Sequence, residues 1–361
     1  MNIRKLIFSC ILTCFFASSV FAQKEFRVTS RGTLMSKTIV SKVLRGTITN
    51  LDSNRTVMVY LPPGYSESKK SYPVVYFLHS IFTNAEKVLA DGKLLRLMET
   101  GFTNNIVDEF ILVVADFSSP TIGSLYENSP ATGRWTDFTV QELVPFIDSN
   151  FRTLPQSPSR ALVGEMMGGR GAFMLGMQYP HIFGLIYAMN PVGTGTGLLP
   201  IEHYPNWRKM HLAKSLADLH DEPISQIFVA ISQAFLPNPD RPPFYCNFLM
   251  EMEKDQLVYH AANAQQLITG FLVHHQLDKY GQNLKQLKAV GFDWSRYDPI
   301  QDHVYGSEAL SRKLDSFGVE HEAEEYRGVY WNENWKDHGR FYGRVLPFLS
   351  RNLLFDKINL E

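Results

Sequence analysis

The chain is poor in cysteine and has almost no surplus charge, and each shortage excludes a class of protein. Only three of its 361 residues are cysteines, and two of these, Cys10 and Cys14, fall in an apolar N-terminal stretch, so only Cys246 lies outside it. Intramolecular disulfides are therefore excluded for the mature chain. With 35 basic and 36 acidic residues, the formal net charge of −1 gives no attraction for nucleic acid.

Long apolar runs are also scarce after the first residues. Arg4 and Lys5 precede an apolar stretch over residues 6–21, and the stretch ends in Ala22 before Gln23. This pattern predicts a secretory signal peptide over residues 1–22 that is cleaved after Ala22 and is too short for a lasting membrane anchor. We therefore expect a secreted or periplasmic protein that has no membrane segment in its mature part, residues 23–361.

Patterns for metals and cofactors are missing as well. The six histidines between residues 203 and 275 form no pair at the helical i, i+3 or i, i+4 spacing that H-E-x-x-H sites use. The run 193–197 is rich in glycine but lacks the lysine and helix that follow a phosphate-binding loop. We expect neither a metal nor a cofactor.

What is present is an alternation of apolar runs and helical patterns. Strands are predicted over residues 39–49, 55–61, 72–78, 110–117, 161–163, 183–189, 287–292 and 321–326, and helices over 140–149, 170–178, 306–317 and 341–354. The first two strands flank a turn and are expected to pair antiparallel. The remaining pattern predicts an α/β fold whose mostly parallel sheet has helices on both faces.

Between residues 194 and 285 this order breaks, because prolines interrupt several helical stretches. We expect a helical insertion that lies over the carboxyl ends of the strands, where lids are found. The alternative is an extra packing layer that has no role in binding.

One short segment bears directly on whether the chain can act as a serine hydrolase. Residues 160–175 predict a buried strand, a sharp turn bounded by Gly164 and Gly168, and a helix, which is the context of a G-x-S-x-G nucleophile turn. The serine position holds Met166. A thioether has no proton to give to a base, and a sulfonium adduct with an acyl group would be unstable, so Met166 cannot act as the serine does.

Four further motifs, at residues 57–65, 72–79, 142–148 and 177–184, occur in order around this turn. Together they resemble the esterase family of α/β-hydrolases that includes esterase D, feruloyl esterases, enterochelin esterase and the mycolyltransferases. The resemblance covers residues 55–191 and, more loosely, 284–353. It implies an α/β-hydrolase fold and carboxylic ester hydrolysis by a serine, a histidine and a carboxylate.

The same resemblance suggests the other catalytic positions. Asp298 lies at the family's acid position, with Asp293 and Asp302 as competitors, although a cap before Pro299 is an equal interpretation. Where the family has glycine and then histidine after the last strand, this chain has residues 328–331 without histidine. His338 is the candidate histidine, and the alternative is a solvated loop residue.

Other residues border the expected cleft. Backbone N–H groups of Ile81, Phe82 and Met167 are the candidate oxyanion donors, although His79-Ser80 stands where the family has histidine and glycine. Tyr126 and Trp135 are candidates for stacking on an aromatic or sugar ring, with packing under the insertion as an equal alternative. Glu165, next to Met166, is expected to point away from the cleft.

Three functions follow from these positions. The first is an inactive or impaired esterase relative that keeps a pocket for a small ester. The second is a hydrolase that uses another nucleophile or an activated water through Glu165, Asp298 and His338. The third is a protein that binds carbohydrates or aromatic esters through the insertion. A displaced histidine would also keep Met166→Ser alone from restoring full activity. The sequence leaves the oligomeric state open.

Overall fold

The computed structural model describes residues 32–197 and 205–356. The signal peptide predicted over residues 1–22 lies outside this part. Within the described residues no helix is both long and apolar enough to cross a membrane.

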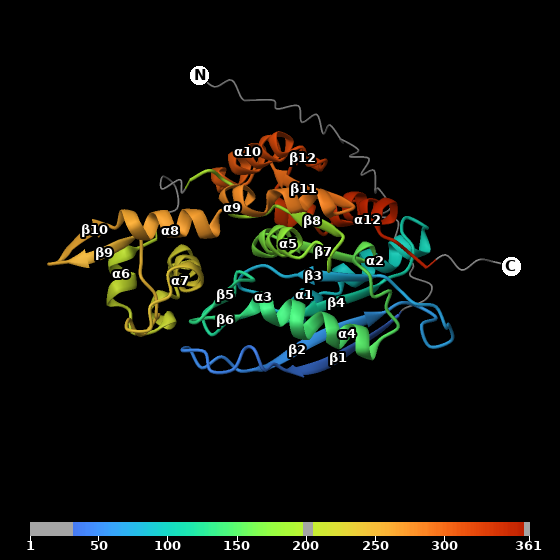
Figure 1. The fold of residues 1–361 in the computed structure, drawn as a ribbon, viewed down its shortest axis with the longest axis horizontal. Coiled ribbons are helices and arrows are strands. Elements are labelled where there is room, and N and C mark those ends of the chain that lie inside the picture. Colours follow the sequence, from blue (N-terminus) through green and yellow to red (C-terminus); the bar gives the residue numbers. More distant parts are fainter. Residues whose placement is uncertain (1–31, 198–204, 357–361) are drawn as a thin grey trace, which may run out of the picture.

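An eight-stranded sheet forms the centre of the molecule (Figure 1). Its order is β1-β2-β4-β3-β7-β8-β11-β12, and only the β1–β2 and β2–β4 pairs are antiparallel. The strands are β1 (Thr33–Val40), β2 (Asn54–Leu61), β3 (Val74–Leu78), β4 (Ile111–Ala115), β7 (Arg160–Glu165), β8 (Leu185–Met189), β11 (Ala289–Ser295) and β12 (Glu322–Tyr326). The predicted mostly parallel sheet is confirmed.

The first strand was misplaced by the sequence pattern. The prediction covered residues 39–49, whereas β1 ends at Val40 and the segment that follows it is made of turns. The structure starts this strand earlier, at Thr33, where most side chains are exposed. An edge strand with little burial lacks the apolar run on which the prediction depended.

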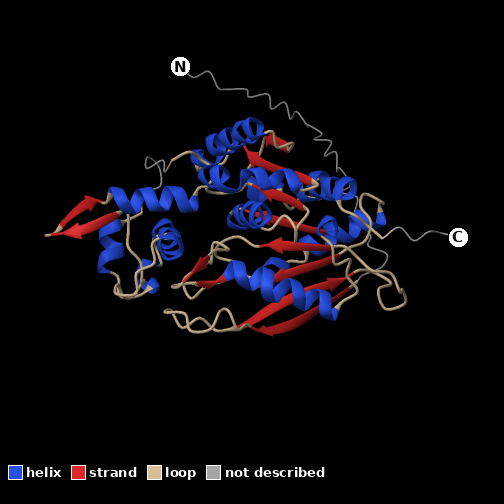
Figure 2. Cartoon of the chain, viewed as in Figure 1, coloured by secondary structure: helices blue, strands red, loops and turns tan. Residues whose placement is uncertain are grey.

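Helices cover both faces of the sheet (Figure 2). One face packs against α4 (Val144–Asn150), α5 (Met167–Gln178) and α10 (Gln301–Phe317), and the other against α1 (Ala85–Ala90), α2 (Lys93–Thr103) and α12 (Leu346–Asn352). Strand β3 shows the reason, because Tyr76 and Leu78 face one core and Val75 and Phe77 face the other. Short helical segments α3 (Trp135–Asp137), η1 (Phe138–Leu143), η2 (Ser157–Ser159), α11 (Tyr330–Glu333) and η5 (Phe341–Val345) complete this body.

Between β8 and β11 the chain leaves the sheet and builds a separate lobe, which extends to the left in Figure 1. Its elements are α6 (Trp207–Leu212), η3 (Leu216–Leu219), α7 (Pro223–Phe235), β9 (Met250–Glu253), β10 (Gln256–Tyr259), α8 (Ala261–Phe271), α9 (Val273–Tyr280) and η4 (Gly281–Gln286). Most of it is helical, but the antiparallel β9–β10 hairpin had no counterpart in the sequence prediction.

A buried arginine fastens this lobe to the body. The guanidinium of Arg170, on α5, donates to the backbone oxygens of Phe271, Gly270 and Leu125 at 2.7 to 3.1 Å and to the carboxylate of Glu127 at 3.0 Å. Because Arg170 is fully buried, these bonds fix the end of α8 next to the sheet.

Candidate active site

Met166 lies at the tip of the turn between β7 and α5. Its backbone has φ 51° and ψ −111°, a strained conformation that nucleophile turns adopt. The N–H of Met166 donates to the Met189 oxygen at 3.0 Å, and the Met166 oxygen accepts from Arg170 N–H at 3.1 Å and Val192 N–H at 3.3 Å. The turn is therefore held on both sides even though its residue carries no hydroxyl.

Two glycines allow the turn to be this tight. A Cβ on Gly168 would lie 1.9 Å from the Leu78 oxygen, and one on Gly164 would lie 2.3 Å from the Gly168 oxygen. The start of α5 thus touches the ends of both β3 and β7, which leaves no space for side chains.

Met166 borders two adjoining cavities. The larger one, about 550 Å³, lies between the turn and the separate lobe, and the smaller one, about 330 Å³, lies towards α1 and α11. Both are lined by Ser80, Ile81, Met166 and Tyr330. The tip of the turn therefore separates two spaces of different lining.

Asp298, the candidate acid, contacts a histidine other than His338. The Nδ1 atom of His303 lies 2.9 Å from Oδ2 of Asp298. Oδ1 of Asp298 accepts the N–H of Ile300 at 2.8 Å, so the residue also caps its loop. Both side chains are buried, and His303 lines the larger cavity together with Met166.

The structure does not bring His338 to this site. His338 is exposed in a turn before η5 and faces the ring of Tyr342, with the ring centroids 5.9 Å apart. The prediction failed because the catalytic histidine was expected only after the last strand. His303 follows Asp298 by five residues, at the start of α10, and this short spacing was the available signal.

The two competing acids have other partners. Asp293 is buried in β11, where it accepts hydrogen bonds from Tyr187 at 2.8 Å and Arg340 at 2.9 Å, so its surroundings are those of a structural ion pair. Asp302 lines the larger cavity, and burial raises the pKa of its carboxyl.

Tyr330 follows the last strand in the segment where the family has its histidine, and it lines both cavities. Burial, followed by the nearby carboxyls of Asp298 and Glu165, raises the pKa of this phenol to about 12. It is therefore neutral at pH 7 and is a poor proton acceptor.

The loop after β3 adopts a fixed shape next to Met166. The buried His79 ring donates from Nδ1 to the Ser80 oxygen at 2.8 Å and accepts the Phe117 N–H at Nε2, at 2.9 Å. Burial lowers the pKa of His79, so the ring stays neutral in this role. Ile81, Phe82 and Met167, the candidate oxyanion donors, all line the larger cavity.

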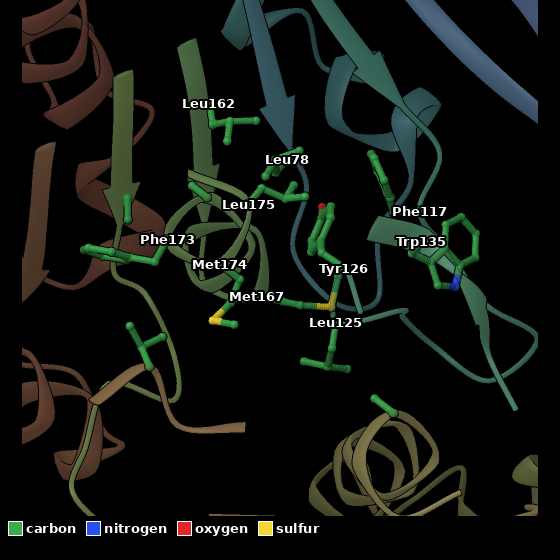
Figure 3. Close-up of a cluster of buried hydrophobic side chains, with 14 of the residues drawn as sticks. Leu78, Phe117, Leu125, Tyr126, Trp135, Leu162, Met167, Phe173, Met174 and Leu175 are labelled. Atoms are coloured by element: carbon green, nitrogen blue, oxygen red, sulfur yellow. The ribbon is translucent and has the colours of Figure 1, made fainter. Parts of the chain in front are cut away.

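Tyr126 and Trp135 do not line either cavity, which corrects the prediction that they bind ligand. At most 1% of the surface of either residue is exposed. Figure 3 shows both within a cluster of buried hydrophobic side chains. The Tyr126 hydroxyl donates to the His79 oxygen at 2.7 Å, and its ring packs where Gly171 has no side chain. The Trp135 indole donates to the Thr132 oxygen at 2.7 Å. Both residues belong to the hydrophobic core, so packing explains their aromatic character.

Glu165 also lies elsewhere than the sequence predicted. It lines the smaller cavity beside Met166 instead of pointing away from the site. Its neighbours are the neutral donors Asn334 and Trp335, and the amide of Asn334 lies 3.5 Å from Oε2. Burial raises the pKa of Glu165 to about 7.

A series of polar side chains connects the linings of the two cavities. Successive members lie within 3.5 Å of each other, and they are Glu165, Asn334, Tyr326, Asn190, Asp298 and His303. Because they come from five separate segments of the chain, no local sequence pattern predicts them. They connect Glu165, which lines the smaller cavity, with His303, which lines the larger one.

Solved structures of esterases have the same fold. A ferulic acid esterase aligns with a TM-score of 0.60 and 19% identity, covering 90% of this chain and 100% of its own. An S-formylglutathione hydrolase from Agrobacterium tumefaciens aligns with a TM-score of 0.56 and 14% identity, covering 90% of this chain and 96% of its own.

Sequence relatives match a shorter part. An endo-1,4-beta-xylanase/feruloyl esterase of Xylanibacter ruminicola is 30% identical over 139 residues, which are 36% of this chain and 18% of that protein. Esterase Rv1288 of Mycobacterium tuberculosis is 30% identical over 132 residues, or 35% of this chain and 26% of that protein. The matches thus span about a fifth to a quarter of these relatives.

The family model described as Putative esterase matches residues 48–281, more than half of the chain. This stretch contains the β2 and β3 strands, the turn at Met166 and most of the separate lobe. The chain therefore belongs to this esterase family of α/β-hydrolases.

Proposed function

We propose that the protein binds a carboxylic ester or acyl compound in the larger cavity without forming an acyl-enzyme. One observation carries this proposal: the tip of the nucleophile turn is Met166, and this side chain lines the cavity. Acyl transfer by the family's route needs a hydroxyl or thiol at that point, because only these groups form an ester or thioester.

The lining of the larger cavity favours an apolar ligand. Helix α7 of the separate lobe contributes Ile224, Ile227 and Ile231, and Phe271 and Met167 add further apolar surface. A volume of about 550 Å³ is in the range of small-molecule sites. This apolar lining favours the binding of an acyl or aromatic group over the binding of a glycan, since sugars need many hydrogen-bonding side chains.

Binding can be tested with ethyl hexanoate and ethyl ferulate in thermal unfolding experiments. A ligand present at 100 times its Kd should add about 2.7 kcal/mol to the free energy of unfolding. Ile227→Trp should fill the cavity and abolish the effect, and Leu212→Trp, at a position 67% exposed, is the matched control. Absence of a shift with both esters, or an unchanged shift in Ile227→Trp, would contradict the proposal.

A separate experiment tests whether an acyl-enzyme forms. The wild-type protein should not be labelled by a fluorophosphonate probe and should hydrolyse nitrophenyl hexanoate no faster than buffer does. Labelling of any serine at this site, Ser80 included, would show that another nucleophile has taken over.

A second candidate function is direct hydrolysis by an activated water. The Asp298–His303 pair supports this candidate. Asp298 is hydrogen-bonded to Nδ1 of His303, which lines the cavity, so Nε2 is the ring nitrogen that could accept a proton from water. Turnover above buffer that disappears in His303→Ala, without probe labelling, would favour this candidate over pure binding.

We also propose that the protein is exported. The support is the basic and then apolar sequence of residues 1–22, which resembles a signal peptide. N-terminal sequencing of the protein from its natural source should give Gln23 as the first residue, and a chain that retains Met1 would refute export by this route.

A further inference from the structure

The smaller cavity has an unusual combination of side chains that the binding of an acyl group does not use. Three aromatic residues, Tyr330, Trp331 and Trp335, line it together with the carboxyl of Glu165. The rings of Tyr330 and Trp331 are almost perpendicular, at 81°, with centroids 4.7 Å apart, and thus form a corner. Trp335 is fixed by the rings of Phe77 and Phe341, at 5.8 and 5.5 Å.

No cation is hydrogen-bonded to Glu165 within the described part of the chain. The partners of its carboxyl are the neutral Asn334 and Trp335. The other charged residues that line the cavity are Lys87, Asp91 and Lys93, all exposed, and Lys93 pairs with Asp91 at 3.0 Å. The cavity therefore has two lysines and one carboxylate in contact with solvent and one sheltered carboxyl among aromatic rings.

We propose that the smaller cavity binds an organic ammonium group, with Glu165 as its counter-ion and Tyr330, Trp331 and Trp335 as its walls. Aromatic faces attract cations through their quadrupole, and a sheltered carboxylate adds a full opposite charge. An organic cation suits this space better than a metal ion, because rings provide no ligand atoms for a metal.

A statement about the whole ligand also rests on the proposed function, because it needs an acyl group in the larger cavity. The two cavities meet at Met166 and Tyr330. A single molecule could thus place its acyl part in the larger cavity and an amine-bearing alcohol part in the smaller one. The compound class is then an acyl ester of an amino alcohol.

Binding of the cation should depend on pH, because Glu165 must be ionised to act as its counter-ion. The carboxyl has a pKa raised to about 7 by burial, whereas Tyr330 stays neutral. A cation should bind only to the ionised carboxylate. Its affinity should therefore be about tenfold higher at pH 8 than at pH 6 and should level off above that.

The test uses choline and its neutral isostere 3,3-dimethylbutan-1-ol, which differ in charge but hardly in shape. Calorimetry at pH 8 should show that the full-length protein binds choline at least about tenfold more tightly than the alcohol. Because choline has no acyl part, failure here would leave the ester-binding proposal standing, and failure of the ester experiment would leave this one standing.

Two variants separate the charge from the aromatic walls. Glu165→Gln should lower choline affinity about tenfold and remove its dependence on pH, and Trp331→Leu should lower affinity at every pH by a similar factor. Glu86→Gln, a change of an exposed carboxylate on α1 that does not line the cavity, is the control and should bind as the wild type does.

Equal binding of the two probes, or unchanged choline affinity in Glu165→Gln, would overturn the proposal. Thermal unfolding of each variant shows whether it is folded. If Trp331→Leu fails to fold, Glu165→Gln still decides the result, since it keeps the size and shape of the side chain.

Discussion

At the scale of single residues, Met166 combines a strained backbone with a side chain that has no exchangeable proton. A non-glycine residue at φ 51° and ψ −111° costs about 1 to 3 kcal/mol, and the surrounding hydrogen bonds hold it there. The turn has therefore kept the shape that presents a nucleophile, although its side chain cannot act as one.

This strain predicts a reversal of the usual effect of glycine. Met166→Gly should be about 1 kcal/mol more stable than Met166→Ala, because only glycine adopts this conformation without cost. At Met174, within α5, the order should reverse, with alanine about 1 kcal/mol more stable than glycine. Urea denaturation of the four variants measures both differences, and the same order at both positions would contradict the assigned strain.

Restoring the hydroxyl should restore part of the chemistry. The sequence led us to expect that Met166→Ser alone would not restore full activity, because the candidate base His338 is displaced. In the structure, however, His303 lines the cavity and is paired with Asp298. We now predict that Met166→Ser reacts with fluorophosphonate and hydrolyses nitrophenyl hexanoate above buffer.

The base in that variant should be His303. Adding His303→Ala to Met166→Ser should lower turnover by about 10²-fold, the lower end of what a general base contributes. Adding His338→Ala is the matched control and should have little effect, since that ring is exposed beside Tyr342. A loss confined to the His338 double variant would restore the assignment made from the sequence.

At the scale of elements, the contact between α5 and the ends of β3 and β7 positions the site. Because Gly168 has no Cβ that would overlap the Leu78 oxygen, helix α5 can begin immediately after Met166. The bonds from Arg170 then hold the separate lobe against this helix. Helix α5 therefore positions both the turn at Met166 and the separate lobe, which line opposite sides of the larger cavity.

Gly168→Ala should therefore destabilise the protein by about 1 to 3 kcal/mol or more, since the new Cβ would overlap the Leu78 oxygen. Gly197→Ala is a suitable control, because no atom of the described residues lies within 4 Å of its Cβ position, and it should change stability by less than about 0.5 kcal/mol. Thermal unfolding measures both, and equal stabilities would contradict the close approach.

At the scale of the whole molecule, Glu165 links stability to pH. Its pKa rises from an ordinary 4.5 to about 7 in the folded protein because of burial. Between these values the folded state holds a proton that the unfolded state has lost. The contribution of Glu165 to stability is thus complete below about pH 4.5 and is lost as pH rises through 7.

Comparison with Glu165→Gln isolates this contribution. The stability of the variant relative to the wild type should increase by roughly 2 to 4 kcal/mol between pH 4.5 and pH 8. Urea denaturation at several pH values measures the difference, in which other titrating groups cancel. A difference that stays constant with pH would show that the carboxyl is not perturbed.

Much of the fold followed from local patterns. The runs at residues 72–78 and 110–117 predicted β3 and β4 closely, because fully buried strands are apolar throughout. Residues 170–178 and 306–317 predicted most of α5 and α10. The exposed edge strand β1 and the β9–β10 hairpin were misplaced or missed, since neither has a continuous apolar run.

The sequence by itself predicted the mostly parallel sheet and the turn at Met166, because buried strands and tight turns depend on neighbours within a few residues. Asp298 was a candidate from the family resemblance. Only the tertiary structure decided that His303 replaces His338 as the partner of Asp298, and that Glu165 faces a cavity while Tyr126 and Trp135 do not. Those outcomes depend on which segments, often more than 100 residues apart, pack together around one point, such as Asn190 and Asp298. Long-range packing of this kind leaves no periodicity in the chain.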